Sequence, residues 1–214
     1  GSGFEDPSIL WEENRGIGKS FGYNREETFD DYNSAELLIL MLCDIVSRGG
    51  NFLLDIGPTA DGRIPVIMED RLIQMGEWLE VNGEAIYGTR RWKKDCQWSE
   101  GTIYAYTKEE FHHGIPDPIL EMATCPKPGQ ARKECYFTKK DDTLYALIPV
   151  LPENGVFYLN DVNLSKNSEI TMLGVQDNLD YKVHSNHVEI KLPKLNPSNA
   201  PCSHVFVLRI SHAK

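Results

Sequence analysis

An aromatic side chain lies beside two carboxylates near the start of the chain, at Trp11, Glu12 and Glu13. This combination suits sugar chemistry, because the ring can pack on the apolar face of a pyranose while a carboxyl group donates a proton or accepts hydroxyl hydrogen bonds. Cleavage of a glycosidic bond with retention requires two carboxyl groups about 5–5.5 Å apart. Taken alone, the tripeptide is weak evidence, and a partly buried Trp beside solvated acids is the more common arrangement.

A second group of aromatic residues follows, with Phe21 and Tyr23 on either side of Gly22. These rings could line a pocket or belong to a short core strand. The preceding segment 16–20, GIGKS, superficially resembles a phosphate-binding loop. That motif requires a Gly where this chain has Glu13, and no buried strand precedes it, so we reject a nucleotide site.

The remaining candidates are a carboxylate and several histidines. Asp55 lies in an apolar run, where it could face a site or form structural hydrogen bonds. His112 and His113 occupy a polar segment, either as a catalytic residue or as a solvated pair, while His184 and His187 flank a predicted turn. Because no CxxC or HExxH spacing occurs, we expect no metal site and no cofactor.

The elements that position these residues are organised around the segment 49–62, GGNFLLDIGPTADG. The apolar run 52–56 predicts a strand buried on both faces. A helix should precede it, capped by Asn33 with Glu36 at capping-box spacing, and end near residue 47. A second helix should run from about 65 to 82. A helix–strand–helix unit is typical of a parallel sheet covered by helices.

The composition changes near residue 90, from helical periodicity to short alternating segments. Such regular short strands predict an antiparallel β-sandwich. Residues 1–32 and 109–132 are predicted to be loops or irregular segments. Turns are expected at 141–142, 153–154 and 185–186. The predicted strands are 102–108, 135–139, 143–149, 155–159, 169–173, 181–184, 187–192 and 204–210.

The overall charge of −10 argues against nucleic acid and anionic membranes as partners, because both require clustered basic residues. No apolar run is long enough to span a bilayer. The opening Gly-Ser-Gly resembles a cloning scar or linker. The chain has five Cys residues. Cys125 and Cys135 could form a disulfide in an exported protein, and five free thiols are the alternative.

Several separate blocks resemble the α-L-fucosidases of glycoside hydrolase family 29. They read WEENRGIGKSFGYN, DIVSRGGNFLLDIGPTADGRIP and RLIQMGEWLEVNGEAIYGTR, and a weaker match continues through ENGVFYLN and ITMLG. The resemblance implies a fold of α/β type followed by all-β: the C-terminal portion of a (β/α)₈-like barrel over residues 1–90 and an antiparallel β-sandwich over 91–214. It also implies a retaining hydrolase that releases terminal α-L-fucose through an Asp nucleophile and a second carboxyl group.

Only some of the family's site residues have counterparts here. Glu12 matches a candidate acid/base in some members, whereas an acid further upstream is the better candidate in others. Trp11, Phe21 and Tyr23 are implied as substrate-binding residues, with Phe21 at a position that is Trp in many relatives. Asp55 replaces a commoner Asn. The nucleophile lies upstream of these blocks, so we predict that this chain alone is inactive.

Two rival functions remain open from the sequence. The chain could be a non-catalytic carbohydrate-binding or interaction module built on the sandwich, or a purely structural fragment. Trp92 and Trp98 lie near the junction of the two regions, where packing is the expected role. The expected partners are a fucosylated glycan and either the missing N-terminal segment or a second copy. By family analogy the location is extracytoplasmic: periplasmic, secreted or lysosomal.

Overall fold

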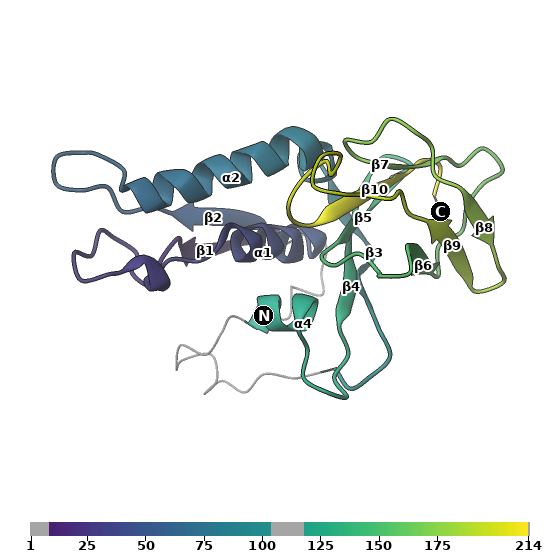
Figure 1. Cartoon of the computed structure of the whole chain (residues 1–214), viewed down its shortest axis with the longest axis horizontal. Coiled ribbons are helices and arrows are strands. Elements are labelled where there is room, and N and C mark those ends of the chain that lie inside the picture. The colour runs from purple at the N-terminus through teal and green to yellow at the C-terminus, as the bar shows by residue number, and fades with distance from the viewer. Residues whose placement is uncertain (1–8, 104–117, 214) are drawn as a thin grey trace.

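The computed structural model describes residues 9–103 and 118–213, in which an α/β region precedes two antiparallel sheets (Figure 1). In the described ranges the elements are β1 (Glu12–Gly16), η1 (Phe29–Asp31), α1 (Ala35–Ser47), β2 (Asn51–Asp55), α2 (Val66–Asn82), η2 (Gly83–Ala85), β3 (Arg90–Trp98), α4 (Pro118–Thr124), β4 (Lys133–Lys140), β5 (Thr143–Ile148), β6 (Val156–Asn160), β7 (Ile170–Met172), β8 (Tyr181–Val183), β9 (His187–Lys191) and β10 (Phe206–Ile210).

Helix α1 is buried over most of its circumference, as its apolar residues predict. Leu38 and Leu40 are fully buried although they lie on different sides of the helix. The predicted cap is wrong by one residue, because Ser34 rather than Asn33 accepts a hydrogen bond from the Leu37 amide, at 3.2 Å. The helix therefore packs on several neighbours and forms the centre of the α/β region.

Strands β1 and β2 pair in parallel, which confirms the parallel sheet. Residues 12–16 were expected to be irregular, because their polar sequence has no apolar alternation, and pairing with β2 makes them a strand. The prediction that β2 is buried on both faces is also wrong. Phe52 and Leu54 pack against the helices, whereas Leu53 faces the opposite side and is 46% exposed.

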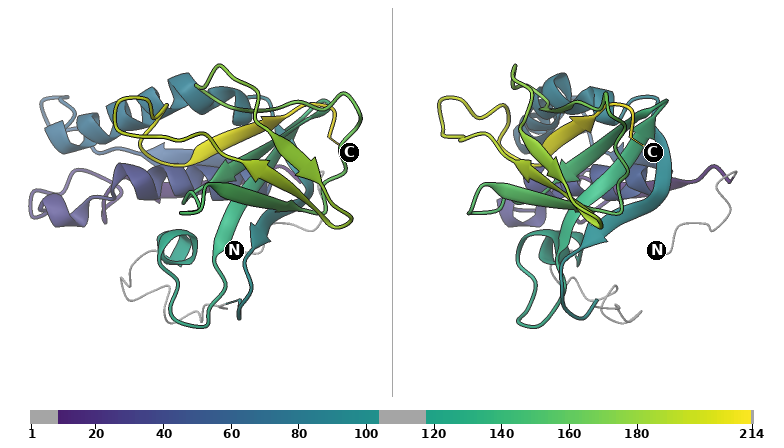
Figure 2. Two further views of the ribbon diagram at one scale, coloured as in Figure 1. Left: turned by 45° about the vertical axis from the view of Figure 1, so that its right-hand side comes forward. Right: turned by 90° about the vertical axis from the view of Figure 1, so that its right-hand side faces the viewer.

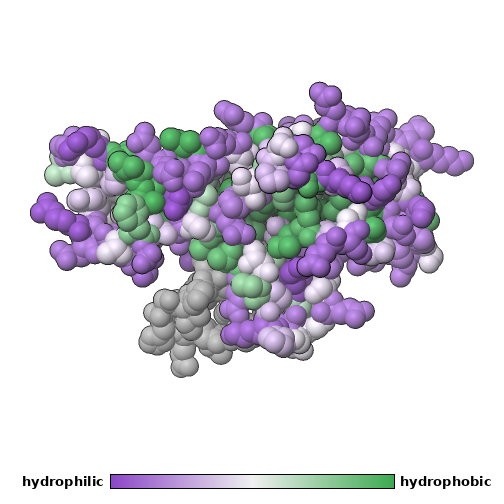
Figure 3. All heavy atoms as spheres, in the orientation of Figure 1, coloured by the Kyte–Doolittle hydropathy of each residue, from purple (hydrophilic) through white to green (hydrophobic). Residues whose placement is uncertain are grey.

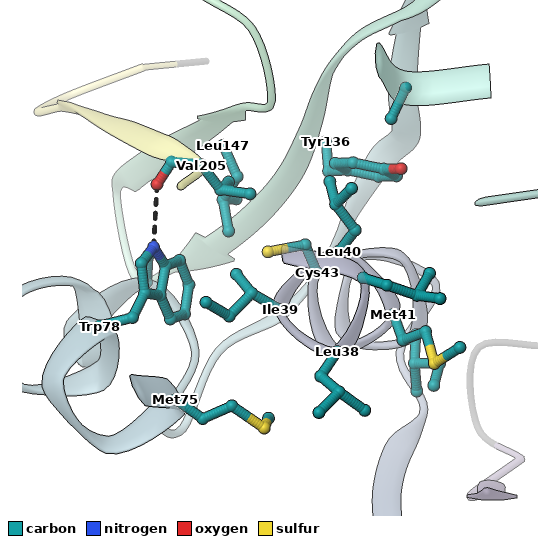
Figure 4. Packing of buried hydrophobic residues seen from close by; sticks show 14 of the residues in the cluster. Leu38, Ile39, Leu40, Met41, Cys43, Met75, Trp78, Tyr136, Leu147 and Val205 are labelled. Atoms are coloured by element: carbon teal, nitrogen blue, oxygen red, sulfur yellow. Dashed lines mark hydrogen bonds between the residues drawn. The ribbon is translucent and has the colours of Figure 1, made fainter. Parts of the chain in front are cut away.

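Helix α2 links the α/β region to the sheets. It begins after Pro65, and Met68 and Met75 lie on its buried face, as predicted. Trp78 is buried on the same helix, and its indole N–H donates to the carbonyl oxygen of Val205 at 3.0 Å (Figure 4). That bond ties the helix to the segment leading into β10.

The C-terminal region is the predicted antiparallel sandwich. One sheet has the order β3-β4-β5-β10-β7 and the other β6-β9-β8. The smaller sheet lies against the larger one in both views of Figure 2. Phe137 and Ile210 of the larger sheet share a hydrophobic cluster with Phe157 and Val188 of the smaller one. The inward-facing residues of both sheets therefore make one core.

Several details of this region differ from the prediction. Strand β3 was missed, because charged residues dominate it and a bulge between Arg91 and Cys96 interrupts its register. The predicted loop 109–132 contains α4, and most of the predicted strand 102–108 lies outside the described residues. The turn at 153–154 connects the two sheets instead of closing a hairpin, since β5 pairs with β10 while β6 pairs with β9.

The α/β region and the larger sheet share a second core. Ile39 and Cys43 of α1 pack with Tyr136, Leu147 and Val205 from the sheet side (Figure 4). Figure 3 shows hydrophobic residues gathered in the middle of the molecule, with hydrophilic residues around them. Because this core crosses residue 90, the division into 1–90 and 91–214 stays a prediction.

The cysteines are free thiols. Cys125 is exposed while Cys135 is fully buried in the sandwich core, so the proposed pair is not formed. Burial raises the pKa of Cys135 well above its usual value. Trp92 and Trp98 both pack inward, as their place near the junction suggested.

Candidate functional site

The loops after β1 and β2 meet at one end of the parallel pair. Both project from the end of the molecule that lies away from the sandwich (Figure 1). A Cβ atom added to Gly57 would lie only 2.2 Å from the backbone nitrogen of Tyr23 and 2.4 Å from the carbonyl carbon of Gly22. The two loops are therefore in direct backbone contact. In α/β sheets, the carboxyl ends of the strands are where ligands bind.

One face of the β1–β2 pair carries polar side chains. Paired residues in a parallel ladder project to the same face, so Glu12 and Asn14 share a face with Asn51, Leu53 and Asp55. This is the face opposite the helices. Asn14 was not among the predicted site residues, because residues 12–16 were expected to be irregular. The all-polar sequence of β1 carries no alternation that would have revealed it.

Phe21 and Tyr23 stand in the loop after β1 with exposed rings. Their exposed fractions are 62% and 43%. Both follow the carboxyl end of the strand, and the backbone at Tyr23 is held against Gly57. Two solvent-facing aromatic rings on a supported loop can stack on the apolar face of a sugar, as the sequence suggested.

Trp11 takes a different position. Its ring is packed so closely on Gly50 that an added Cβ there would lie 2.5 Å from it, and it contacts the helical core. Its carbonyl oxygen accepts a hydrogen bond from the Asn51 amide at 3.0 Å. Trp11 therefore holds the start of β1 against β2, and the structure does not bring its ring together with Phe21 and Tyr23.

Glu12 is exposed and is the first residue of β1. At a rise of about 3.3 Å per residue, the strand places it roughly 13 Å from Gly16, where the aromatic loop begins. Glu13 projects to the helix side and pairs with Arg15 at 2.7 Å. Of the two adjacent carboxylates, only Glu12 is therefore on the uncovered face, and it lies at the opposite end of the strand from the loops.

Asp55 ends β2 on the same face as Glu12. Its carbonyl oxygen accepts a hydrogen bond from the Ile17 amide at 2.9 Å, so its backbone fixes the start of the first loop. The carboxylate is partly buried and lies at the carboxyl end of the strand. Among the predicted carboxylates, it is the one nearest in the fold to the two loops.

An ion pair between Lys19 and Asp31 stabilises the loop after β1. Lys19 donates to the Asp31 carboxylate at 2.7 Å, and the Thr28 amide donates to the same group. The Lys19 hydrogen bond, reinforced by that of Thr28, lowers the pKa of Asp31 to about 2. The Ser20 amide donates to the carboxylate of Glu27 at 2.7 Å. These bonds connect the two ends of the loop that carries the aromatic residues.

Within 9–103 and 118–213, no cluster of His, Cys, Asp and Glu is arranged to hold a metal ion. The rings of His184 and His187 stack 4.4 Å apart, and His184 contacts Glu189 at 3.3 Å, so these side chains are used in contacts with one another. His112 and His113 lie outside the described residues.

Among the described helices, none has the length and hydropathy to cross a bilayer.

Comparison with known families gives two matches in chain order. Residues 4–84 match the model described as α-L-fucosidase, and residues 129–211 match the α-L-fucosidase C-terminal domain. Human tissue α-L-fucosidase is 32% identical over 210 residues, covering 97% of this chain and 38% of that protein. Human plasma α-L-fucosidase is also 32% identical, over 205 residues, covering 94% and 38%. The chain thus spans a little over a third of the length of these relatives.

Solved structures give the same result. The α-fucosidase of Thermotoga maritima in complex with fucose superposes with a TM-score of 0.70 at 32% identity, covering 95% of this chain and 40% of that one. An α-L-fucosidase isoenzyme from Paenibacillus thiaminolyticus, at 21% identity and a TM-score of 0.66, shares the fold. The α/β region and the sandwich therefore have the same fold as about 40% of the longer Thermotoga maritima chain.

Proposed function

Because the chain belongs to the α-L-fucosidase family, glycoside hydrolase family 29, we propose that it forms the C-terminal part of a retaining α-L-fucosidase. The observation that carries this proposal is the match of both family models in order, with the β1–β2 loops presenting Phe21 and Tyr23 at the carboxyl ends of parallel strands. The substrate would be a terminal α-L-fucose on a glycan or glycoconjugate.

In this proposal Phe21 and Tyr23 stack on the apolar face of fucose. Asp55 is placed to accept a hydrogen bond from a sugar hydroxyl, since it ends β2 beside the same loops. Trp11 acts as a positioning residue, because its ring packs on Gly50. The close contact between Gly57 and Tyr23 supports a fixed arrangement of the aromatic loop, which lowers the cost of ordering the site on binding.

The chemistry requires two carboxyl groups. A nucleophile attacks the anomeric carbon and forms a glycosyl-enzyme, while an acid protonates the leaving oxygen and then activates water. The family resemblance assigns the nucleophile to an Asp upstream of β1. Glu12 is the candidate acid/base within this chain, but its place at the start of β1 favours the alternative, an acid from another strand.

The uncovered face of the sheet supports a partner for the α/β region. Leu53 on that face of β2 is 46% exposed. In the described part of the chain, β2 pairs only with β1, so its other edge is open. We propose that further barrel strands, or a second copy, cover this edge. Sedimentation at increasing concentration tests the second arrangement, which a strictly monomeric sample would exclude.

For the location we propose an extracytoplasmic compartment. The human relatives are named tissue and plasma α-L-fucosidase. Fractionation of the source cells would test this. Recovery of the protein only in the cytosolic fraction would contradict it.

The test of activity is the hydrolysis of 4-nitrophenyl α-L-fucoside by the product of the complete reading frame, assayed beside chain 1–214. We expect turnover by the complete product, with retained anomeric configuration in the released fucose. For chain 1–214 alone we expect none. A complete product without fucosidase activity would contradict the proposal, and turnover by 1–214 alone would contradict the assignment of the nucleophile upstream.

A further inference from the structure

A small pocket opens on the sandwich, where the start of β4, the β5–β6 connection and β6 meet. It has a volume of about 140 Å³, and its lining includes Arg132, Glu134, Pro152, Asn154 and Tyr158. Its walls combine charged groups, an amide and an aromatic residue within one concavity. Small-ligand sites are concave in this way and carry a few polar groups on an otherwise apolar wall.

The polar side of the pocket is held by a buried amide. Gln97 of β3 is 4% exposed, and its Nε2 donates to Glu134 Oε2 at 2.9 Å and to the Tyr158 carbonyl oxygen at 2.8 Å. Its Oε1 accepts from the Asn160 amide at 2.9 Å. The Gln97 side chain therefore binds both the Glu134 carboxylate and the backbone of β6, and it holds these two parts of the pocket at a fixed distance.

Asn154, in the β5–β6 connection, is another lining residue. Its Oδ1 accepts a hydrogen bond from the Val156 amide at 3.1 Å. This bond fixes the orientation of the side chain, so that Nδ2 is the group able to donate to a ligand. Arg132 and Glu134 also line the pocket, so its lining combines two residues that carry donors with one that carries an acceptor.

Tyr158 is one of the lining residues and carries an aromatic ring. The residue is 46% exposed, and its ring contacts that of His187 edge-to-face, with centroids 5.4 Å apart. The cross-strand partner of Tyr158 is Glu189. The ring is therefore supported by His187 of β9, and almost half of the surface of Tyr158 remains exposed. A supported Tyr ring with polar groups at its edge combines apolar contact with hydrogen bonding.

We infer that this pocket binds one neutral monosaccharide unit of a glycan. The ring of Tyr158 would cover an apolar sugar face, while Arg132, Glu134 and Asn154 would bind its hydroxyl groups. Because Arg132 and Glu134 carry opposite charges, the pocket has little net charge of its own, which suits a neutral ligand with several hydroxyl groups. The inference does not depend on catalysis: it predicts binding by the sandwich whether or not the proposed hydrolysis is found.

The test is titration of the ¹⁵N-labelled full chain with L-fucose, D-galactose and N-acetyl-D-glucosamine, followed by amide chemical shifts. We expect saturable shifts at Arg132, Glu134 and Tyr158 with at least one of these sugars. Tyr158→Ala should weaken that affinity about tenfold, as expected for losing an aromatic contact of about 1.4 kcal/mol. Glu134→Gln should weaken it as well, without moving the backbone shifts of β6.

Tyr87→Ala is the matched control, since Tyr87 is an exposed tyrosine, 61% accessible, away from the pocket lining. It should leave the sugar affinity unchanged. No saturable shift with any of the three sugars would overturn the inference. So would shifts confined to the β1–β2 loops, or binding that Tyr158→Ala leaves intact in a variant with an unperturbed amide spectrum.

Discussion

The side chain of Glu12 projects from the first residue of β1, on the face that Leu53 leaves exposed. The family resemblance makes it a candidate acid/base, yet the aromatic loop begins four residues later. Asp55 and Tyr23 lie at the carboxyl end instead. At the scale of single residues, Glu12 therefore matches the family motif but lies at the end of β1 that is away from the loops, where catalysis is not expected.

The first prediction tests this separation. General acid/base groups contribute about 10²–10⁴-fold to rate. Because Glu12 lies at the wrong end of β1, we expect Glu12→Gln to lower kcat for 4-nitrophenyl α-L-fucoside by less than about tenfold in the complete protein. Glu13→Gln, which breaks the pair with Arg15 on the helix side, is the control. A loss above about 100-fold with rescue by azide would restore Glu12 as the acid/base.

A second residue-scale prediction concerns Asp31. Its pKa in the folded protein is lowered from 3.8 to about 2, mainly by the hydrogen bond from Lys19. A depressed pKa means that the ionised group stabilises the fold above its unfolded pKa, and that this contribution is lost as the pH falls through the folded value. Asp31→Asn should therefore be less stable than the wild type at pH 7.

The stability difference should disappear between about pH 4 and pH 2, the interval between the unfolded and folded pKa values of Asp31. Urea unfolding of both proteins at several pH values measures it. A difference that stays constant down to pH 2 would show that the Lys19–Asp31 contact does not act through the charge.

At the scale of elements, the two loops depend on a glycine where backbones meet. A Cβ at Gly57 would overlap the Gly22–Tyr23 backbone, so Gly57→Ala must push the loops apart. We expect a loss of about 1–3 kcal/mol in unfolding free energy, as for overpacking elsewhere. Hydrogen exchange at the Tyr23 amide should also become faster, because the loop loses its support.

Gly76 offers the matched control. It lies inside α2, and a Cβ added there would meet nothing within 4 Å. Gly76→Ala should stabilise the protein by about 0.5–1 kcal/mol, because glycine loses more backbone entropy in a helix than alanine. Equal and small effects at both glycines would contradict the close contact between the loops.

At the scale of the whole molecule, the α/β region and the sandwich are joined by a buried ionic cluster. Asp44 of α1 accepts from Lys133 of β4, and Arg48 approaches the same carboxylate at 2.7 Å. The side chains of Asp44 and Lys133 are 5% and 3% exposed. The Lys133 ammonium also lies 5.1 Å from the centre of the Tyr136 ring. This cluster fixes the helix on the sheet.

Removing one partner should be costly. We expect Lys133→Met to lower the unfolding free energy by about 3 kcal/mol, near the lower end for a broken buried pair because Arg48 still faces Asp44. Urea denaturation measures it. The exposed pair Lys182–Glu189 is the control, and Lys182→Met should cost less than about 1 kcal/mol. Similar losses in the two variants would contradict a structural role for the buried cluster.

The helix α1, the strand β2, the parallel pairing and the antiparallel sandwich could all be predicted from periodicity and turn residues, because those signals are local. The quoted blocks were also sufficient to identify the family. Strands β1 and β3 could not be found in this way, since their sequences are polar and only their partners, β2 and β4, make them strands.

The sequence by itself determined the class of fold, the family and the aromatic residues of the loop at 21–23. Only the tertiary structure decided where the predicted site residues lie: Trp11 is packed on Gly50, Glu12 lies at the far end of β1, and Tyr23 lies against Gly57. The pocket that Tyr158 lines is also a product of the tertiary structure, because it lies between β4 and the segment 150–158. The physical reason is that local propensity depends on neighbours in the chain, whereas a site depends on contacts between residues far apart in it, such as Gln97 with Glu134.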